Sequence, residues 1–187
     1  MEDELKLYES TAEESMQSAI THLDDALAHI RAGKANPRVL DPVMIEYYGA
    51  MTPISNCASV TTPDARTIAI TPWEKKMIGE IERAIINSNI GFAPSNNGET
   101  IRLVLPPLTE ERRRDLCKQC KGEVENAKMS IRNARRDAIE EFKKLVKKGL
   151  SEDIEKDAEA EMQKTHDSYI AKADALYAAK EKEIMTV

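Results

Sequence analysis

The sequence predicts an α+β protein in which a long three-helix bundle carries a small inserted α/β domain, mostly β, on a hinge of two strands. Near both ends of the chain, apolar residues recur at steps of three and four, which is typical of amphipathic helices. Residues 32–106, both ends included, contain five of the seven glycines and seven of the eight prolines, among short apolar runs typical of strands and turns. We therefore expect a discontinuous bundle of residues 1–31 and 106–187 and an inserted domain of residues 32–105.

A first helix is predicted near the N-terminus, because the apolar residues there follow one helical stripe. The stripe contains Leu5, Tyr8, Ala12, Ala19, Leu23, Ala26, Leu27 and Ile30. In the inserted domain, strands are predicted at residues 43–45, 54–60, 66–70 and 101–105, and a helical pattern returns over residues 72–87.

A second, much longer helix is predicted after Pro106 and Pro107, with Thr109 as a favourable N-cap and Gly149 at its end. Its apolar positions alternate steps of four and three, as in a bundle or coiled coil. They are Leu116, Cys120, Val124, Ala127, Ile131, Ala134, Ala138, Phe142 and Leu145.

A third helix is predicted to begin after Ser151, which is a good N-cap residue. Its expected inner face contains Ile154, Ala158, Met162, Thr165, Tyr169 and Leu176. Because the chain leaves the bundle and returns to it, two covalent crossings are expected, near Ala32–Gly33 and Pro106–Pro107, and paired crossings can act as a hinge.

Composition and motifs argue against a membrane protein and give little support for an enzyme. No stretch approaches the roughly 20 apolar residues that span a bilayer, and the N-terminus is acidic, so we expect a cytoplasmic protein. No phosphate-binding or dinucleotide-binding glycine motif occurs, and no cofactor is expected. We expect His22, His29 and His166 at surface or boundary positions, and no metal site.

The three cysteines are expected to be reduced thiols. Cys117 and Cys120 have CxxC spacing but lie inside a predicted helix, and Cys120 fits the apolar stripe, so packing is the favoured interpretation. A redox or other enzyme using this pair is a remote alternative, which would need a lowered thiol pKa.

The net charge of −6 conceals one basic segment. Residues 1–30 carry a net charge of −7, residues 31–109 carry +1, residues 110–148 carry +5 and residues 149–187 carry −5. Nine of the thirteen basic residues in segment 110–148 fall within an arc of about 120° on the second helix, whose centre lies about 135° from that of the apolar stripe. They are Arg114, Lys118, Lys121, Lys128, Arg132, Arg135, Arg136, Lys143 and Lys147.

This basic face predicts contact with the backbone of folded RNA. Arg132, Arg135 and Arg136 cluster within two turns, and arginine suits bidentate contact with phosphate. Aromatic residues are nearly absent from the helix, which argues against stacking on unpaired bases. The alternative is a solvated face that pairs with the acidic third helix.

Several strings resemble the bacterial ribosome recycling factor family over roughly residues 20–187. They include RAGKANP at residues 31–37, EYYG at 46–49, LPPLTEERR at 105–113, IRNARRD at 131–137, LSED at 150–153 and KEKEI at 180–184. The resemblance implies an L-shaped protein of tRNA-like dimensions that binds the post-termination ribosome, chiefly through large-subunit rRNA. It also implies that the protein, with elongation factor G and GTP hydrolysed by that partner, splits the ribosome into subunits and releases it from mRNA.

The resemblance also assigns roles to residues of this chain. Arg132, Arg135 and Arg136 match an arginine motif that faces large-subunit RNA, and Arg112 and Arg113 match arginines at the start of the same helix. The candidate RNA-binding residues are therefore Arg31, Lys34, Arg112, Arg113, Lys128, Arg132, Arg135 and Arg136, with Lys34 standing where many members have Arg. The candidate hinge residues are Ala32, Gly33, Pro106 and Pro107.

Another class of function remains open from the residues alone. A helical-bundle adaptor or chaperone would hold a protein partner through its apolar stripe and acidic helices, and its binding would survive nuclease and depend little on salt. In either case each helix has partners within the chain, so a monomer is expected.

Overall fold

The computed structural model describes residues 1–186, which form two compact units. The bundle unit contains Met1–Ala32 and Glu110–Thr186, and the inserted unit contains Gly33–Thr109. The chain therefore passes between the units at Ala32–Gly33 and at Thr109–Glu110. Pro106 and Pro107 lie near the end of the inserted unit. Among the described residues, no helix combines the length and apolar character that crossing a membrane requires.

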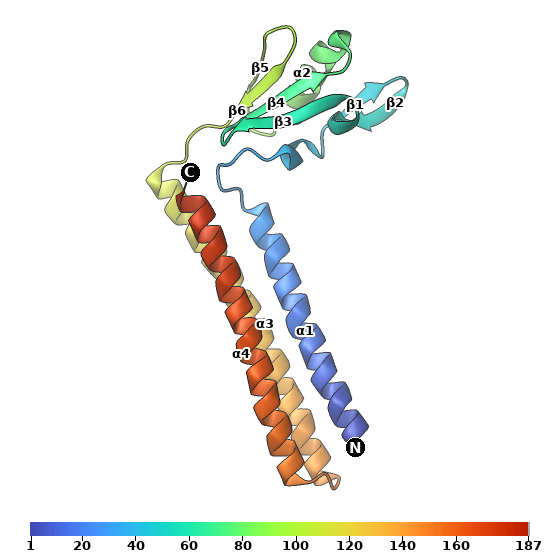
Figure 1. Ribbon diagram of the computed structural model, residues 1–187, viewed down its shortest axis with the longest axis vertical. Helices are drawn as coiled ribbons and strands as arrows, with labels where there is room; N and C mark the ends of the chain where they lie inside the picture. The colour runs from blue at the N-terminus through green and yellow to red at the C-terminus, as the bar shows by residue number, and fades with distance from the viewer. Residues whose placement is uncertain (187) are drawn as a thin grey trace. The chain divides into compact units, whose positions relative to one another are not determined.

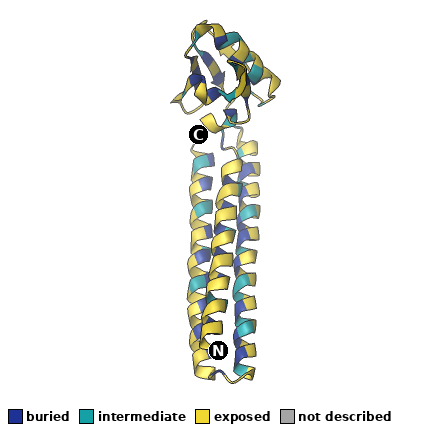
Figure 2. Ribbon diagram, turned by 90° about the vertical axis from the view of Figure 1, so that its right-hand side faces the viewer, coloured by how far each residue is buried: buried dark blue, intermediate teal, exposed yellow. Residues whose placement is uncertain are grey.

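The bundle unit consists of three long helices, α1 (Glu2–His29), α3 (Glu110–Lys147) and α4 (Glu152–Met185), each of which packs against the other two (Figure 1). Their buried residues face one another and exposed residues cover the outer faces (Figure 2). Ser151 caps α4, since its hydroxyl oxygen accepts a hydrogen bond from the backbone N–H of Asp153 at 3.3 Å.

The predicted stripe of α3 is confirmed almost residue for residue. Every predicted position is buried except Ala134, which is partly buried. In α1, the structure adds Met16 and Ile20 to the buried face. Steps of three and four depend only on the local helix period, and this is why the sequence shows them clearly.

The prediction for α4 needs two corrections. Ile154 is exposed, whereas His166, which we expected at a surface or boundary position, is buried with 8% of its area accessible. The observed inner face follows Ala158, Met162 and His166, so it is rotated relative to a face drawn through Thr165. His166 can be buried because its Nδ1 lies 2.9 Å from the Asp167 carboxylate, which satisfies one ring nitrogen.

The inserted unit contains two antiparallel sheets. A hairpin pairs β1 (Met44–Tyr47) with β2 (Ala50–Pro53). The second sheet has the order β3-β4-β6-β5, formed by β3 (Ala58–Asp64), β4 (Thr67–Pro72), β6 (Ile101–Val104) and β5 (Pro94–Asn96). Helix α2 (Ile78–Asn87) and three short 3₁₀ turns, Pro37–Leu40, Ile54–Asn56 and Lys75–Met77, complete the unit.

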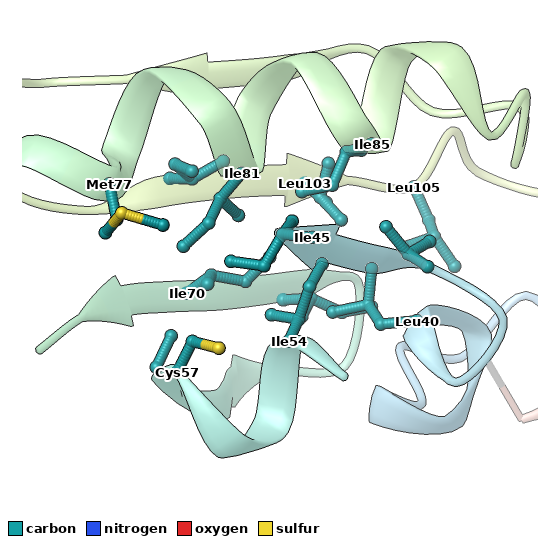
Figure 3. Packing of buried hydrophobic residues seen from close by; sticks show 14 residues of the cluster. Leu40, Ile45, Ile54, Cys57, Ile70, Met77, Ile81, Ile85, Leu103 and Leu105 are labelled. Atoms are coloured by element: carbon teal, nitrogen blue, oxygen red, sulfur yellow. The ribbon is translucent and has the colours of Figure 1, made fainter. Parts of the chain in front are cut away.

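One apolar cluster holds the inserted unit together (Figure 3). Ile81 and Ile85 of α2 contribute one side, and the strands contribute Ile45, Ile70 and Leu103, all buried. Ile54–Asn56 forms a 3₁₀ turn where a strand was predicted, although Ile54 is buried in the same cluster. A separate apolar core of this kind allows the unit to fold around its own contacts.

Candidate RNA-binding surface

The basic residues predicted to share one face all lie on α3 and mostly point to solvent. Seven of them are exposed: Arg114, Lys118, Lys121, Arg132, Arg136, Lys143 and Lys147. The other two, Lys128 and Arg135, are partly buried. The opposite side of the helix carries the buried stripe, so α3 packs with one face and presents cationic groups on another.

Arg132 and Arg136 are the more accessible members of the arginine cluster. Arg136 Nε lies 3.7 Å from the Asp137 carboxylate, with side-chain exposures of 64% and 70%. An ion pair this exposed contributes little and is readily exchanged for another anion. Among residues 1–186, Arg132 makes no hydrogen bond or ion pair. Both guanidinium groups can therefore reach an external phosphate at little cost.

Lys128 and Arg135 are instead held by α4. Lys128 Nζ lies 2.6 Å from the Asp174 carboxylate, and only 16% of the lysine side chain is exposed. Arg135 donates a hydrogen bond from Nη1 to Gln163 Oε1 at 2.6 Å. These contacts link α3 to α4, and sequence reasoning missed them because the partners lie far apart along the chain. The solvated-face alternative thus holds for Lys128 in part, since an acidic residue of α4 neutralises it.

The remaining candidate residues lie near the two crossings. Arg112 is exposed and Arg113 partly buried in the first turn of α3, where the buried Nε of Arg113 has no hydrogen-bond partner among the described residues. Arg31 is exposed in the bundle unit and Lys34 is exposed in the inserted unit. The structure therefore brings Arg132, Arg135 and Arg136 together on one helix but does not join Arg31 and Lys34 in one unit.

Gly33 stands at the first crossing in a conformation that requires glycine. Its φ is +75°, and a Cβ added there would lie 2.7 Å from Leu108 Cγ. A side chain at this position would thus meet both backbone strain and a steric clash. The sequence shows that position 33 is a glycine, but it could not predict the close approach of Leu108, because the two residues meet only in the folded unit.

Both connecting segments are fastened to the turn between β3 and β4. The Ala35 backbone N–H donates to Ala65 O at 2.7 Å, and the Leu105 N–H donates to Arg66 O at 2.8 Å. Asp64 stiffens the turn, since its carboxylate accepts a hydrogen bond from the Arg66 N–H at 2.9 Å, and this bond lowers the pKa of Asp64. The two connecting segments at the candidate hinge are therefore both hydrogen-bonded to the same turn.

Cys117 and Cys120 do not have the lowered thiol pKa that redox or nucleophilic chemistry needs. Cys120 is buried and Cys117 partly buried, and burial raises the pKa of both thiols. A raised pKa disfavours the reactive thiolate near neutral pH. Among residues 1–186 there is no cluster of three or more His, Cys, Asp or Glu side chains that could hold a metal ion.

Comparison with known proteins gives one consistent result. A family model described as "Ribosome recycling factor" matches residues 2–185. The chain is 66% identical to a ribosome-recycling factor of Parabacteroides distasonis over 176 residues, covering 94% of both chains. It is 59% identical to one of Porphyromonas gingivalis, covering 98% of this chain and 100% of the relative.

Two solved structures agree with these relatives. A solution structure of ribosome recycling factor has a TM-score of 0.76 at 36% identity and covers 98% of both chains. A second structure has a TM-score of 0.62 at 44% identity and covers 96% of this chain and 98% of its own. That structure is of Thermus thermophilus ribosome recycling factor and Escherichia coli elongation factor G bound to the Escherichia coli post-termination complex. With the family model matching nearly the whole chain, the protein belongs to the ribosome recycling factor family.

Proposed function

We propose that this protein recycles ribosomes: it binds the post-termination ribosome and, with elongation factor G and GTP, splits it into subunits and releases it from mRNA. The observation that carries this proposal is the match to ribosome recycling factor over residues 2–185. The similar Thermus thermophilus factor is described together with elongation factor G on a post-termination complex. The protein acts in the cytoplasm and needs no catalytic residue of its own, because the partner hydrolyses GTP.

The basic face of α3 is the proposed contact with large-subunit rRNA. Arg132 and Arg136 supply accessible guanidinium groups, and Arg135 lies between them in sequence on the same helix. Phosphate neutralisation by such groups releases counterions and makes binding dependent on salt. The full proposed RNA-binding set is Arg31, Lys34, Arg112, Arg113, Lys128, Arg132, Arg135 and Arg136.

The two crossings are the proposed hinge, with Ala32, Gly33, Pro106 and Pro107 as its residues. The inserted unit has its own core, and the bundle unit consists of helices that pack on each other along their lengths. A stiff bundle anchored to RNA can transmit a push that the partner applies to the inserted unit. Rotation at the crossings would let the inserted unit move while the bundle unit stays bound to RNA.

The proposed function is tested by light scattering on post-termination ribosomes. We expect scattering to fall only when the protein, elongation factor G and GTP are all present, with an initiation factor added to block reassociation. A variant with Arg132, Arg135 and Arg136 changed to Ala should bind ribosomes more weakly, with a salt dependence lower by about three phosphate contacts.

A matched control variant also loses three positive charges, but from residues outside the basic face of α3. It removes three exposed lysines of α4, Lys156, Lys164 and Lys172. This control should retain both binding and splitting. If scattering does not fall with the intact protein and all components present, the splitting activity is refuted. If nuclease-treated extracts still yield a salt-insensitive complex, a protein adaptor is the better description.

A further inference from the structure

We propose that Gln163 is a positioning residue for Arg135, and that it fixes the arginine on α3 before the protein meets RNA. The inference rests on the proposed contact between Arg135 and rRNA and adds residues of α4 to it. Gln163 lies 28 positions after Arg135 in sequence, so the pair exists only because α3 and α4 pack together.

The hydrogen bonds of Gln163 leave its amide only one orientation. Arg135 can only donate, so it must meet the amide oxygen, and the Arg135 Nη1 to Gln163 Oε1 distance is 2.6 Å. The Asp167 carboxylate can only accept, so it must meet the amide nitrogen, and Gln163 Nε2 lies 2.9 Å from Asp167 Oδ1. The contacts with Arg135 and with Asp167 therefore require the same orientation of the Gln163 amide.

Asp167 is itself fixed by a buried residue. His166 Nδ1 lies 2.9 Å from the same Asp167 oxygen, and only 8% of His166 is exposed. Since a carboxylate only accepts, Nδ1 carries the proton in this contact. Hydrogen bonds from His166 and Gln163, together with the positive charge of Arg135, lower the pKa of Asp167. The chain of contacts therefore runs from the bundle interior, through a charged carboxylate and an amide, to the guanidinium.

The other two guanidinium nitrogens of Arg135, Nε and Nη2, are not held by Gln163. The Arg135 Nε is buried without a hydrogen-bond partner, whereas Nη1 is held by Gln163. Nη2 makes no hydrogen bond to residues 1–186, so its two N–H groups remain for a ligand. A guanidinium held at one end in this way has already lost much of the side-chain freedom that binding would otherwise remove.

A role in stability alone explains the arrangement less well. Gln163 is exposed, the Asp167 side chain is 64% exposed, and surface polar contacts contribute little to folding. Neighbouring Arg132 makes no comparable contact among the described residues, so the network singles out one arginine of the cluster. Removing the Gln163 amide should therefore change binding through Arg135 and leave the bundle folded.

The test is a double-mutant cycle with Gln163→Ala, Arg135→Ala and the double variant, measured as affinity for vacant bacterial ribosomes. We expect Gln163→Ala to weaken binding by about two- to tenfold, because Arg135 must then be ordered during binding. In the Arg135→Ala background, the same change should have no further effect. The salt slope should fall by about one for Arg135→Ala and stay unchanged for Gln163→Ala, which retains every cation.

The matched control is Gln17→Ala, which removes the same side chain from an exposed position of α1 and should leave affinity unchanged. Thermal unfolding of Gln163→Ala should match that of the intact protein. The positioning role is overturned if Gln163→Ala binds as tightly as the intact protein, or if it weakens binding equally in both backgrounds. If Arg135→Ala itself binds normally with an unchanged salt slope, the proposed RNA contact at Arg135 is wrong and there is nothing for Gln163 to position.

Discussion

The arginines of α3 differ in how far the fold restrains their guanidinium groups. Arg132 is exposed without an ion pair among residues 1–186, Arg136 shares a loose pair with its neighbour Asp137, and Arg135 is tied to Gln163 on another helix. The sequence predicted the shared face of these residues because a helix face follows from spacing. It could not predict the restraint on Arg135, since that contact joins residues far apart along the chain.

Gly33 gives a prediction about backbone conformation at a single residue. Gly33→Ala should destabilise the inserted unit, because an L-residue at φ +75° is strained by about 1–2 kcal/mol and its Cβ would also displace Leu108. Gly98→Ala is the control, since Gly98 has φ +88° but no atom within 4 Å of an added Cβ. Urea unfolding should therefore show the larger loss for Gly33→Ala. Equal losses would mean that the Leu108 contact costs nothing.

At the scale of elements, how well the sequence predicted each one depends on where its stabilising contacts lie. Helix α3 was predicted almost position by position because its stripe is local. Strands β2 and β5 were missed because each is short, contains proline and is defined by pairing with one neighbour. The anchors of the candidate hinge on Ala65 and Arg66 were missed for the same reason, since hydrogen bonds between distant segments leave no periodic pattern.

The β1–β2 hairpin gives a prediction in alkaline solution. Tyr48 and Gly49 turn the chain with φ of +50° and +82°, and the Tyr48 hydroxyl donates a hydrogen bond to the Glu74 carboxylate. This hydrogen bond, with the negative charge of Glu74, raises the pKa of Tyr48 from 10.0 to about 12. Because the folded pKa lies above the unfolded value, the stabilisation is complete below pH 10 and is lost as pH rises through about 12.

The measurement is an ultraviolet titration of phenolate absorbance, with Tyr48→Phe subtracted to isolate this one phenol. Tyr48 should ionise near pH 12, and Glu74→Gln should bring its pKa back toward 10 because the carboxylate charge is gone. Ionisation of Tyr48 near pH 10 in the intact protein, or an unchanged pKa in Glu74→Gln, would show that the hydrogen bond does not hold the turn in solution.

At the scale of the whole molecule, the proposed hinge rests on the division of the chain into two compact units. The bundle unit is built from helices that pack along their lengths, and the inserted unit folds around a separate apolar cluster. Within residues 1–186, the chain passes between them twice, at Ala32–Gly33 and at Thr109–Glu110. Both connecting segments are fixed to one turn on the side of the inserted unit, so bending there would occur between the anchor and the helices rather than within the sheet.

If the two connecting segments act as a hinge, ribosome binding and subunit splitting can be uncoupled. A reducible disulfide between two engineered cysteines, one in each unit, should leave ribosome affinity unchanged while subunit splitting with elongation factor G and GTP falls to the rate without the factor. Reduction should restore splitting in the same sample, which makes each protein its own control. The native thiols interfere little, because Cys57 and Cys120 are buried and Cys117 is partly buried. A cross-linked protein that splits ribosomes at the full rate would show that the units act as one rigid body and that the crossings are only connectors.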